Sequence, residues 1–153
     1  MDATNLIQDI PIAHFLPHRA PMLMVDRIWE ISKEHVLCSF LIAADNIFVE
    51  EGRFTEMGLV EHMAQVCSAI VGQTFFDENH QSIGRERVIG FISGIKSLQI
   101  LALPAVGEDL QTNSSLHSQF DGDDFSICTM HVSAFVNTVE VANAEINLFL
   151  KTP

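Results

Sequence analysis

Glu61 is the residue of this sequence that is best placed to do acid–base chemistry. Residues 55–72 fit one helix, and at about 100° per residue most of its apolar side chains gather on one broad face. Glu61 lies nearly opposite that face, together with Gly58, Gln65, Ser68 and Gly72. No Lys, Arg or Asp occurs from residue 57 to residue 76, whereas a solvated helix face usually carries long charged side chains. We therefore expect Glu61 to face a ligand or another chain, although an ordinary surface carboxylate would show the same periodicity.

The start of the same helix offers a second chemical group. Thr55 fits the N-cap position, and the first-turn N–H groups, as far as Gly58, would then be free to meet a polarised oxygen at the positive end of the helix. A glycine would let a carbonyl oxygen approach closely, but it would equally allow tight packing of the helix. If burial raises the pKa of Glu61, its carboxyl group could donate a proton beside that oxygen.

The elements that would position this helix are strands of an antiparallel sheet. Segments 22–32 and 35–44 alternate apolar and polar residues around a Lys33-Glu34 turn and predict a hairpin, followed by an irregular loop at 45–54 and the helix at 55–75. After a polar stretch, four further segments predict long strands, at 88–103, 108–120, 123–136 and 139–150. Because no βαβ alternation demands parallel strands, we predict an α+β fold with about five to six antiparallel strands around one long helix.

Composition limits the classes of partner. The 153 residues, 48% of them hydrophobic, fit a single domain, 1–153, with a proline-punctuated lead-in at 1–21. A net charge of -12 argues against binding to nucleic acid or to an anionic membrane. Because no signal peptide, membrane span, phosphate-binding loop or metal motif is found, we expect a cytoplasmic protein without cofactor or metal. The three cysteines sit in apolar segments and are expected to be reduced core thiols: Cys38, Cys67 and Cys128.

Four segments also occur in a recognisable order: LPHRAPMLMVDR at 16–27, GLVEHMAQ at 58–65, GFISGIK at 90–96 and PAVGEDL at 104–110. This order resembles the hot-dog-fold 3-hydroxyacyl-[acyl-carrier-protein] dehydratases, and more closely their relatives in aryl polyene pigment gene clusters. The resemblance implies a long helix wrapped by an antiparallel sheet, dimerised side by side. It also implies dehydration of a 3-hydroxyacyl thioester to a trans-2-enoyl thioester, in which a helix Glu works with a His from the neighbouring subunit.

The resemblance maps the catalytic Glu onto Glu61, but Arg53 stands where the family has its His. Arginine cannot accept a proton at neutral pH, though it could hold a phosphate or carboxylate. His18 precedes the first strand, titrates in the right range and could reach a neighbouring site. His62 points about 100° away from Glu61, toward the core or an interface, and His14 has a smaller claim. A mechanism in which Glu61 alone carries the proton is also open.

We accordingly predict Glu61 and His18 as catalytic residues. The predicted substrate-binding residues are Arg53, Thr55, Gly58 and Gln65. The resemblance implies a substrate carried on acyl carrier protein, which is acidic, so the basic residues Arg85, Arg87 and Lys96 are the candidate docking patch.

Long edge strands and the small-residue face of the helix indicate a homodimer. A higher oligomer, or a heterodimer with a paralogue, is the alternative. Two other functions fit the same residues: a hot-dog thioesterase, in which the helix carboxylate acts as nucleophile or activates water, and a catalytically silent acyl-binding or partner subunit of an active dehydratase.

Overall fold

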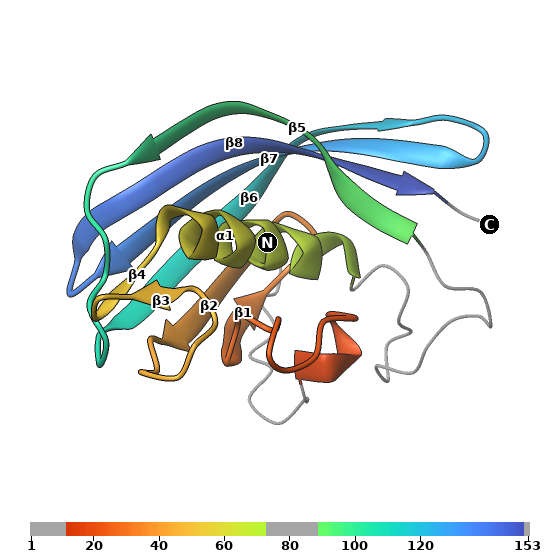
Figure 1. Cartoon of the computed structure of the whole chain (residues 1–153). Helices are drawn as coiled ribbons and strands as arrows, with labels where there is room; N and C mark the ends of the chain where they lie inside the picture. The colour runs from red at the N-terminus through yellow and green to blue at the C-terminus, as the bar shows by residue number, and fades with distance from the viewer. Residues whose placement is uncertain (1–11, 73–88, 152–153) are drawn as a thin grey trace.

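A curved antiparallel sheet covers one long helix in the computed structural model, which describes residues 12–72 and 89–151 (Figure 1). The helix, α1 (Glu56–Gly72), packs on one side of a six-stranded sheet with the order β1-β2-β6-β7-β8-β5. Their bounds are β1 Arg27–Ile31, β2 His35–Leu41, β5 Ile89–Ile100, β6 Asp109–Asp121, β7 Phe125–Val136 and β8 Val139–Lys151. The neighbouring strands pair antiparallel. The α+β hot-dog architecture predicted from the sequence is therefore confirmed.

The helix begins at the cap that the sequence predicts. Thr55 Oγ1 accepts a hydrogen bond from the Gly58 N–H at 3.4 Å and donates one to the Phe48 carbonyl at 2.8 Å. The apolar face of α1 packs into the core, where these side chains are almost wholly buried: Leu59, Met63, Val66, Cys67, Ala69 and Ile70. The predicted end of the helix at residue 75 lies outside the described residues. Burial of this face against the sheet supplies most of the stability of such a helix.

Burial alternates along the long strands, so that one sheet face packs on α1 and the other faces outward. In β7, for example, Cys128, Met130 and Val132 are buried, whereas Ile127 and His131 are exposed. The four long strands begin and end within three residues of the predicted segments. A period of two in the sequence is therefore a reliable guide to these strands.

Two short-range predictions need correction. The first strand begins at Arg27 and not at residue 22, because the backbone of Met22 and Met24 bonds to side chains of α1 and not to a neighbouring strand. The loop expected at 45–54 contains a small hairpin, β3 Val49–Glu50 and β4 Arg53–Phe54. Its turn residues Glu51 and Gly52 have φ of 52° and 76°, which suits a two-residue hairpin.

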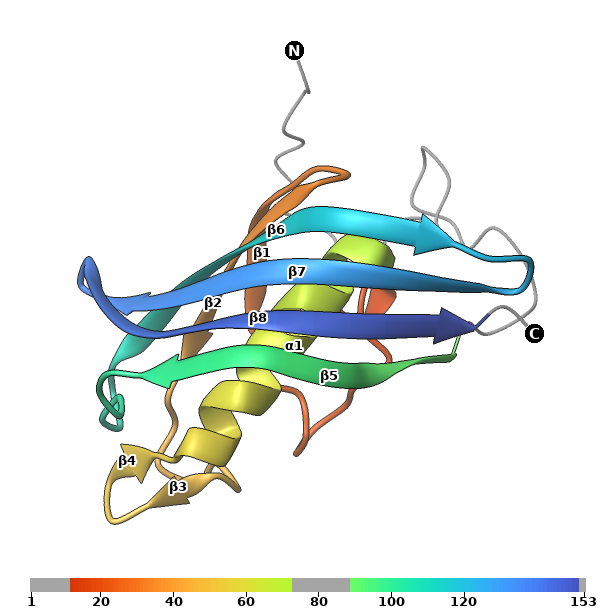
Figure 2. The ribbon, with the colours of Figure 1, turned by 90° about the horizontal axis from the view of Figure 1, so that it is seen from above.

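The strand β5 forms one edge of the six-stranded sheet. It pairs with β8 on one side, and no described strand pairs with its other side (Figure 2). Three of its apolar side chains, Ile92, Ile95 and Leu98, are register partners of buried β8 residues and so project toward the helix side. They nevertheless remain 37% to 44% exposed. An edge of this kind invites pairing with another chain.

The three cysteines are buried free thiols, as predicted. Burial raises the pKa of the Cys67 thiol to about 12, so this residue is not a nucleophile at neutral pH. Among the described residues, no helix has the length and apolar character needed to cross a bilayer.

Candidate active site

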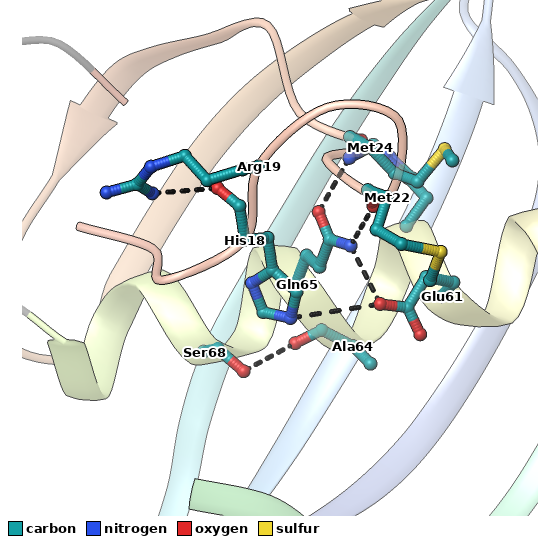
Figure 3. Close-up of polar contacts among 9 residues, drawn as sticks. His18, Arg19, Met22, Met24, Glu61, Ala64, Gln65 and Ser68 are labelled. Carbon is teal, nitrogen blue, oxygen red and sulfur yellow. Dashed lines mark hydrogen bonds and ion pairs between the residues drawn. The ribbon is translucent and has the colours of Figure 1, made fainter. Parts of the chain in front are cut away.

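Glu61 lies on the side of α1 that faces the lead-in segment (Figure 3). Its side chain is 28% exposed. Gln65, one turn later on the same helix face, donates a hydrogen bond from Nε2 to Glu61 Oε1 at 2.7 Å. The small-residue face of the helix therefore carries a carboxylate held in one orientation, partly covered by this chain's own lead-in.

His18 approaches Glu61 from the lead-in segment of the same chain. Its Nε2 lies 3.8 Å from Glu61 Oε1, and its side chain is 30% exposed. Arg19 Nη1 donates to the carbonyl oxygens of Leu16 and His18, each at 2.8 Å, and so fixes the turn that presents the imidazole. His18 Nδ1 is buried without a hydrogen-bond partner among the described residues. The two residues predicted as catalytic thus come together, with one ring nitrogen turned toward the carboxylate.

The surroundings of His18 favour its neutral form. Burial lowers its pKa from the ordinary value of 6.5, the charge of Glu61 partly offsets that effect by raising it, and Arg19 lowers it further. A neutral imidazole can accept a proton, so at neutral pH the site pairs a base with a carboxyl group.

Gln65 joins the carboxylate to residues 22–24, which follow the lead-in. Its Oε1 accepts from the Met24 N–H at 2.7 Å, and its Nε2 donates to the Met22 carbonyl at 2.8 Å as well as to Glu61. The residue is only 1% exposed. Both N–H groups of the Gln65 amide form hydrogen bonds within the protein. Gln65 is therefore a positioning residue that orients Glu61, and its amide N–H groups are not free to bind a substrate.

His62, the residue after Glu61, also binds the segment 22–24. Its Nδ1 lies 2.6 Å from the Met24 carbonyl and its Nε2 lies 2.7 Å from Thr112 Oγ1. Since a carbonyl only accepts, Nδ1 carries the proton and Nε2 accepts from the Thr112 hydroxyl. Burial lowers the pKa of His62 to about 4. This histidine is therefore neutral and fully bonded, and offers no free base. The sequence left the core and an interface open as its surroundings, and the structure has it in the core.

The other predicted site residues lie at the start of α1. A Cβ on Gly58 would come within 2.7 Å of Phe54 Cζ and 2.8 Å of Phe48 Cβ, so the glycine allows the close packing that the sequence left as its alternative role. Its N–H, which the sequence left free for a substrate oxygen, donates to Thr55. Arg53 is exposed on β4 and donates from Nη1 to the Leu103 carbonyl at 2.9 Å.

The remaining candidates are the predicted docking patch and His14. Arg85 and Arg87 of the predicted docking patch, and the His14 side chain, fall outside the described residues. Lys96 Nζ lies 3.6 Å from Glu145 Oε2. The described residues contain no group of three or more His, Cys, Asp or Glu that could hold a metal ion.

The sequence analysis did not predict the role of the backbone of Met22 and Met24. This backbone forms three hydrogen bonds with α1 side chains: the Met24 N–H donates one, and the carbonyls of Met22 and Met24 each accept one. The available signal was the spacing of Glu61, His62 and Gln65 on one helix. Three polar side chains within five positions of an otherwise apolar helix need partners when buried.

Comparison with known proteins gives matches over nearly the whole chain. A model of ApeP-like proteins, described as ApeP dehydratase, matches residues 10–152. The 3-hydroxyacyl-[acyl-carrier-protein] dehydratase FabZ of Alkalilimnicola ehrlichii is 26% identical over 146 residues, which cover 89% of this chain and 86% of that protein.

Solved structures share the fold at low sequence identity. The dehydratase heterocomplex ApeI:P from Xenorhabdus doucetiae has a TM-score of 0.74 at 18% identity, covering 94% of this chain and 91% of that chain. A hypothetical thioesterase from Streptococcus pneumoniae, solved with coenzyme A, has a TM-score of 0.62 at 15% identity, covering 82% of this chain and 85% of that chain.

Proposed function

This chain belongs to the ApeP-like dehydratase family, and we propose that it removes water from a 3-hydroxyacyl thioester to give the trans-2-enoyl thioester. The observation that carries this proposal is the 3.8 Å separation of His18 Nε2 and Glu61 Oε1. Elimination needs a base for the C2 proton and an acid for the C3 hydroxyl. Two groups at this distance can meet adjacent carbons of one substrate.

In the proposed reaction, neutral His18 with its proton on Nδ1 accepts the C2 proton at Nε2. The electrons of the C2–H bond form the C2=C3 double bond, and the C3–O bond breaks as the Glu61 carboxyl group protonates the leaving hydroxyl. Water and the enoyl thioester leave, and His18 returns its proton to Glu61. Gln65 holds Glu61 Oε1 throughout through a 2.7 Å hydrogen bond.

We assign the thioester carbonyl to the first turn of α1, where N–H groups and the helix dipole favour a developing negative charge. Gly58, whose N–H already donates to Thr55 Oγ1, lies three residues before Glu61, and Thr55 caps the helix six residues before it. Arg53 is exposed nearby in sequence, on β4, and its guanidinium suits a phosphate of the carrier's prosthetic arm.

The substrate is proposed to arrive on acyl carrier protein in a polyene or lipid pathway. The buried free thiols suit the reducing cytoplasm, where we place the reaction. We further propose a homodimer that pairs through β5, supported by the exposed apolar residues Ile92, Ile95 and Leu98 on that edge strand. A heterodimer with a paralogous dehydratase would use the same edge.

The deciding assay offers the isolated protein a 3-hydroxyacyl thioester and, separately, the saturated acyl thioester, both on carrier protein. We expect an enoyl product from the first and no free thiol from either. Glu61→Gln and His18→Asn should each lower the rate by roughly 10²- to 10⁴-fold. His117→Asn, at an exposed position on β6, is the matched control and should keep full activity.

Two results would redirect the assignment. Thiol release from both substrates would identify a thioesterase. Arg53, which cannot act as a base, motivates the second alternative, a silent partner subunit. A folded protein that turns over neither substrate alone, but raises the rate of an active dehydratase whether or not Glu61 is intact, would establish that role.

A further inference from the structure

An apolar row crosses the outer face of the sheet, on the side away from α1. Phe120 of β6 pairs with Ile127 of β7, Ile127 pairs with Phe149 of β8, and Phe149 pairs with Phe91 of β5. The residues next to them on the strands, such as Cys128 and Leu148, are buried on the helix side. The row therefore faces outward, across four strands that lie side by side in Figure 2.

The aromatic rings of this row contact one another. The ring centroids of Phe91 and Phe149 lie 5.1 Å apart, those of Phe149 and Phe125 5.6 Å, and those of Phe125 and Phe120 6.2 Å. Phe120 is nevertheless 63% exposed, Phe91 53% and Ile127 37%. We call Phe91, Phe120, Phe125, Ile127 and Phe149 the outer patch. Contiguous exposed apolar surface of this kind usually marks a binding site.

The rest of the outer face does not share this character. The next register rows carry Thr129 paired with Asn147 and His131 paired with Glu145. Thr129 donates a hydrogen bond to Asn147, and His131 Nε2 lies 2.7 Å from Glu145 Oε1. The outer face is therefore polar in the register rows next to the outer patch, which bounds the patch on that side.

Charge identifies the kind of occupant. Asp121 ends β6, and Asp123 and Asp124 form the exposed turn that leads into Phe125, whereas Lys151 ends β8. The rim thus carries three acidic groups against one basic group among these residues. At this rim, the same rim of a second copy or another acidic surface would be repelled, whereas a basic partner would be attracted.

The length of the outer patch fits a helical partner. Four strands about 4.8 Å apart make a row of about 14 Å, which matches the rise of about 16 Å over positions i, i+4, i+7 and i+11 of a helix. We propose that the outer patch docks a basic amphipathic helix of a partner protein, laid across the strands with its Lys or Arg residues over the Asp-rich turn. This surface is separate from the site of His18 and Glu61.

The probe is a labelled amphipathic peptide of about 18 residues made of Leu and Lys at helical spacing, with a Leu and Glu peptide of the same pattern for comparison. We expect the full chain to bind the Lys peptide and not the Glu peptide in fluorescence anisotropy. Phe120→Ser should weaken binding at least about 10-fold. Val139→Ser removes an apolar side chain that is 64% exposed at the start of β8 and should leave binding unchanged.

Added salt should weaken the complex, because the turn carboxylates contribute, and Asp123→Asn should do the same. Equal binding to the parent chain and to Phe120→Ser would overturn the proposal, since attraction to an acidic protein would then suffice. Absence of binding, or binding of the Glu peptide, would also overturn it. Sedimentation that shows a larger assembly dissociated by Phe120→Ser would assign the outer patch to a second copy instead.

Discussion

Two residues outside the proposed proton transfers orient His18 and Glu61 toward each other. Arg19 fixes the turn that carries His18, and Gln65 fixes Glu61. The two residues that we propose as catalytic are thus oriented by hydrogen bonds that lie within the protein. This arrangement holds both groups near productive geometry before any substrate binds.

The pH dependence of turnover tests His18 as the base. A base works unprotonated, so kcat/KM should fall on the acidic side as His18 takes up a proton. Because burial lowers the pKa of His18, the midpoint of that fall is expected below 6.5, the ordinary value. Steady-state rates between about pH 5 and 8 measure it.

Arg19 supplies the matched variants. Its charge lowers the pKa of His18, so Arg19→Gln should move the acidic limb to higher pH, whereas Arg19→Lys should leave it in place. A limb that stays unchanged in both variants and persists in His18→Asn would show that another group titrates.

For single residues, the sequence was informative where the proposed chemistry requires a particular type of side chain. Glu61 stood out because long charged side chains were absent around it, and His18 because it titrates near neutral pH. Their distance was not predictable, since it depends on how the lead-in folds onto α1. The two readings of Gly58 could not be separated either, because only the structure reveals Phe48 and Phe54 against it.

The elements around the site are joined by a buried hydrogen-bonded link. His62 connects α1 to the Met24 carbonyl, just after the lead-in, and to Thr112 of β6. Gln65 adds two bonds to the same segment. Residues 22–24 therefore follow the helix and not the sheet, which is why their strand-like alternation was misleading.

This link should make stability depend on pH. The pKa of His62 is about 4 in the folded chain against 6.5 when exposed, so the unfolded chain binds more protons between these values. Its contribution is fully present above about pH 6.5 and is lost as pH falls toward 4. At pH 5 the free energy of unfolding should be lower by about 2 kcal/mol than at pH 7.5 from this group alone.

Urea unfolding at both pH values measures that loss. His62→Gln removes the titration, so its stability should be lower at neutral pH but should change less between the two conditions. An equal change in the parent chain and in His62→Gln would assign the pH dependence to other groups.

At the scale of the whole molecule, the main feature is the edge strand β5, which pairs with β8 alone among the described strands. In a single chain, Ile92, Ile95 and Leu98 of β5 are exposed although they project to the core side. Alternation in the sequence located β5 and its apolar residues, but it could not show that α1 leaves them uncovered, because that depends on the curvature of the sheet.

Association through β5 is tested by charge. Ile95→Lys should shift the protein from dimer to monomer in sedimentation velocity, because a lysine would be buried in the interface without a partner. Leu41→Lys, at a position that is 51% exposed at the end of β2, should leave the dimer intact. A dimer that survives Ile95→Lys would place the interface elsewhere.

His18 and Glu61 are contributed by one and the same polypeptide, whereas the family that the sequence resembles divides its pair between neighbours. Each chain would then be catalytically self-sufficient. Mixing His18→Asn with Glu61→Gln protein, with subunit exchange verified, should restore no activity, whereas a pair shared between the subunits of a dimer would regain about a quarter of the sites by random reassortment. By the same logic, one intact chain in a mixed assembly would keep its full turnover, and pairing would serve to complete the fold and not to complete the chemistry.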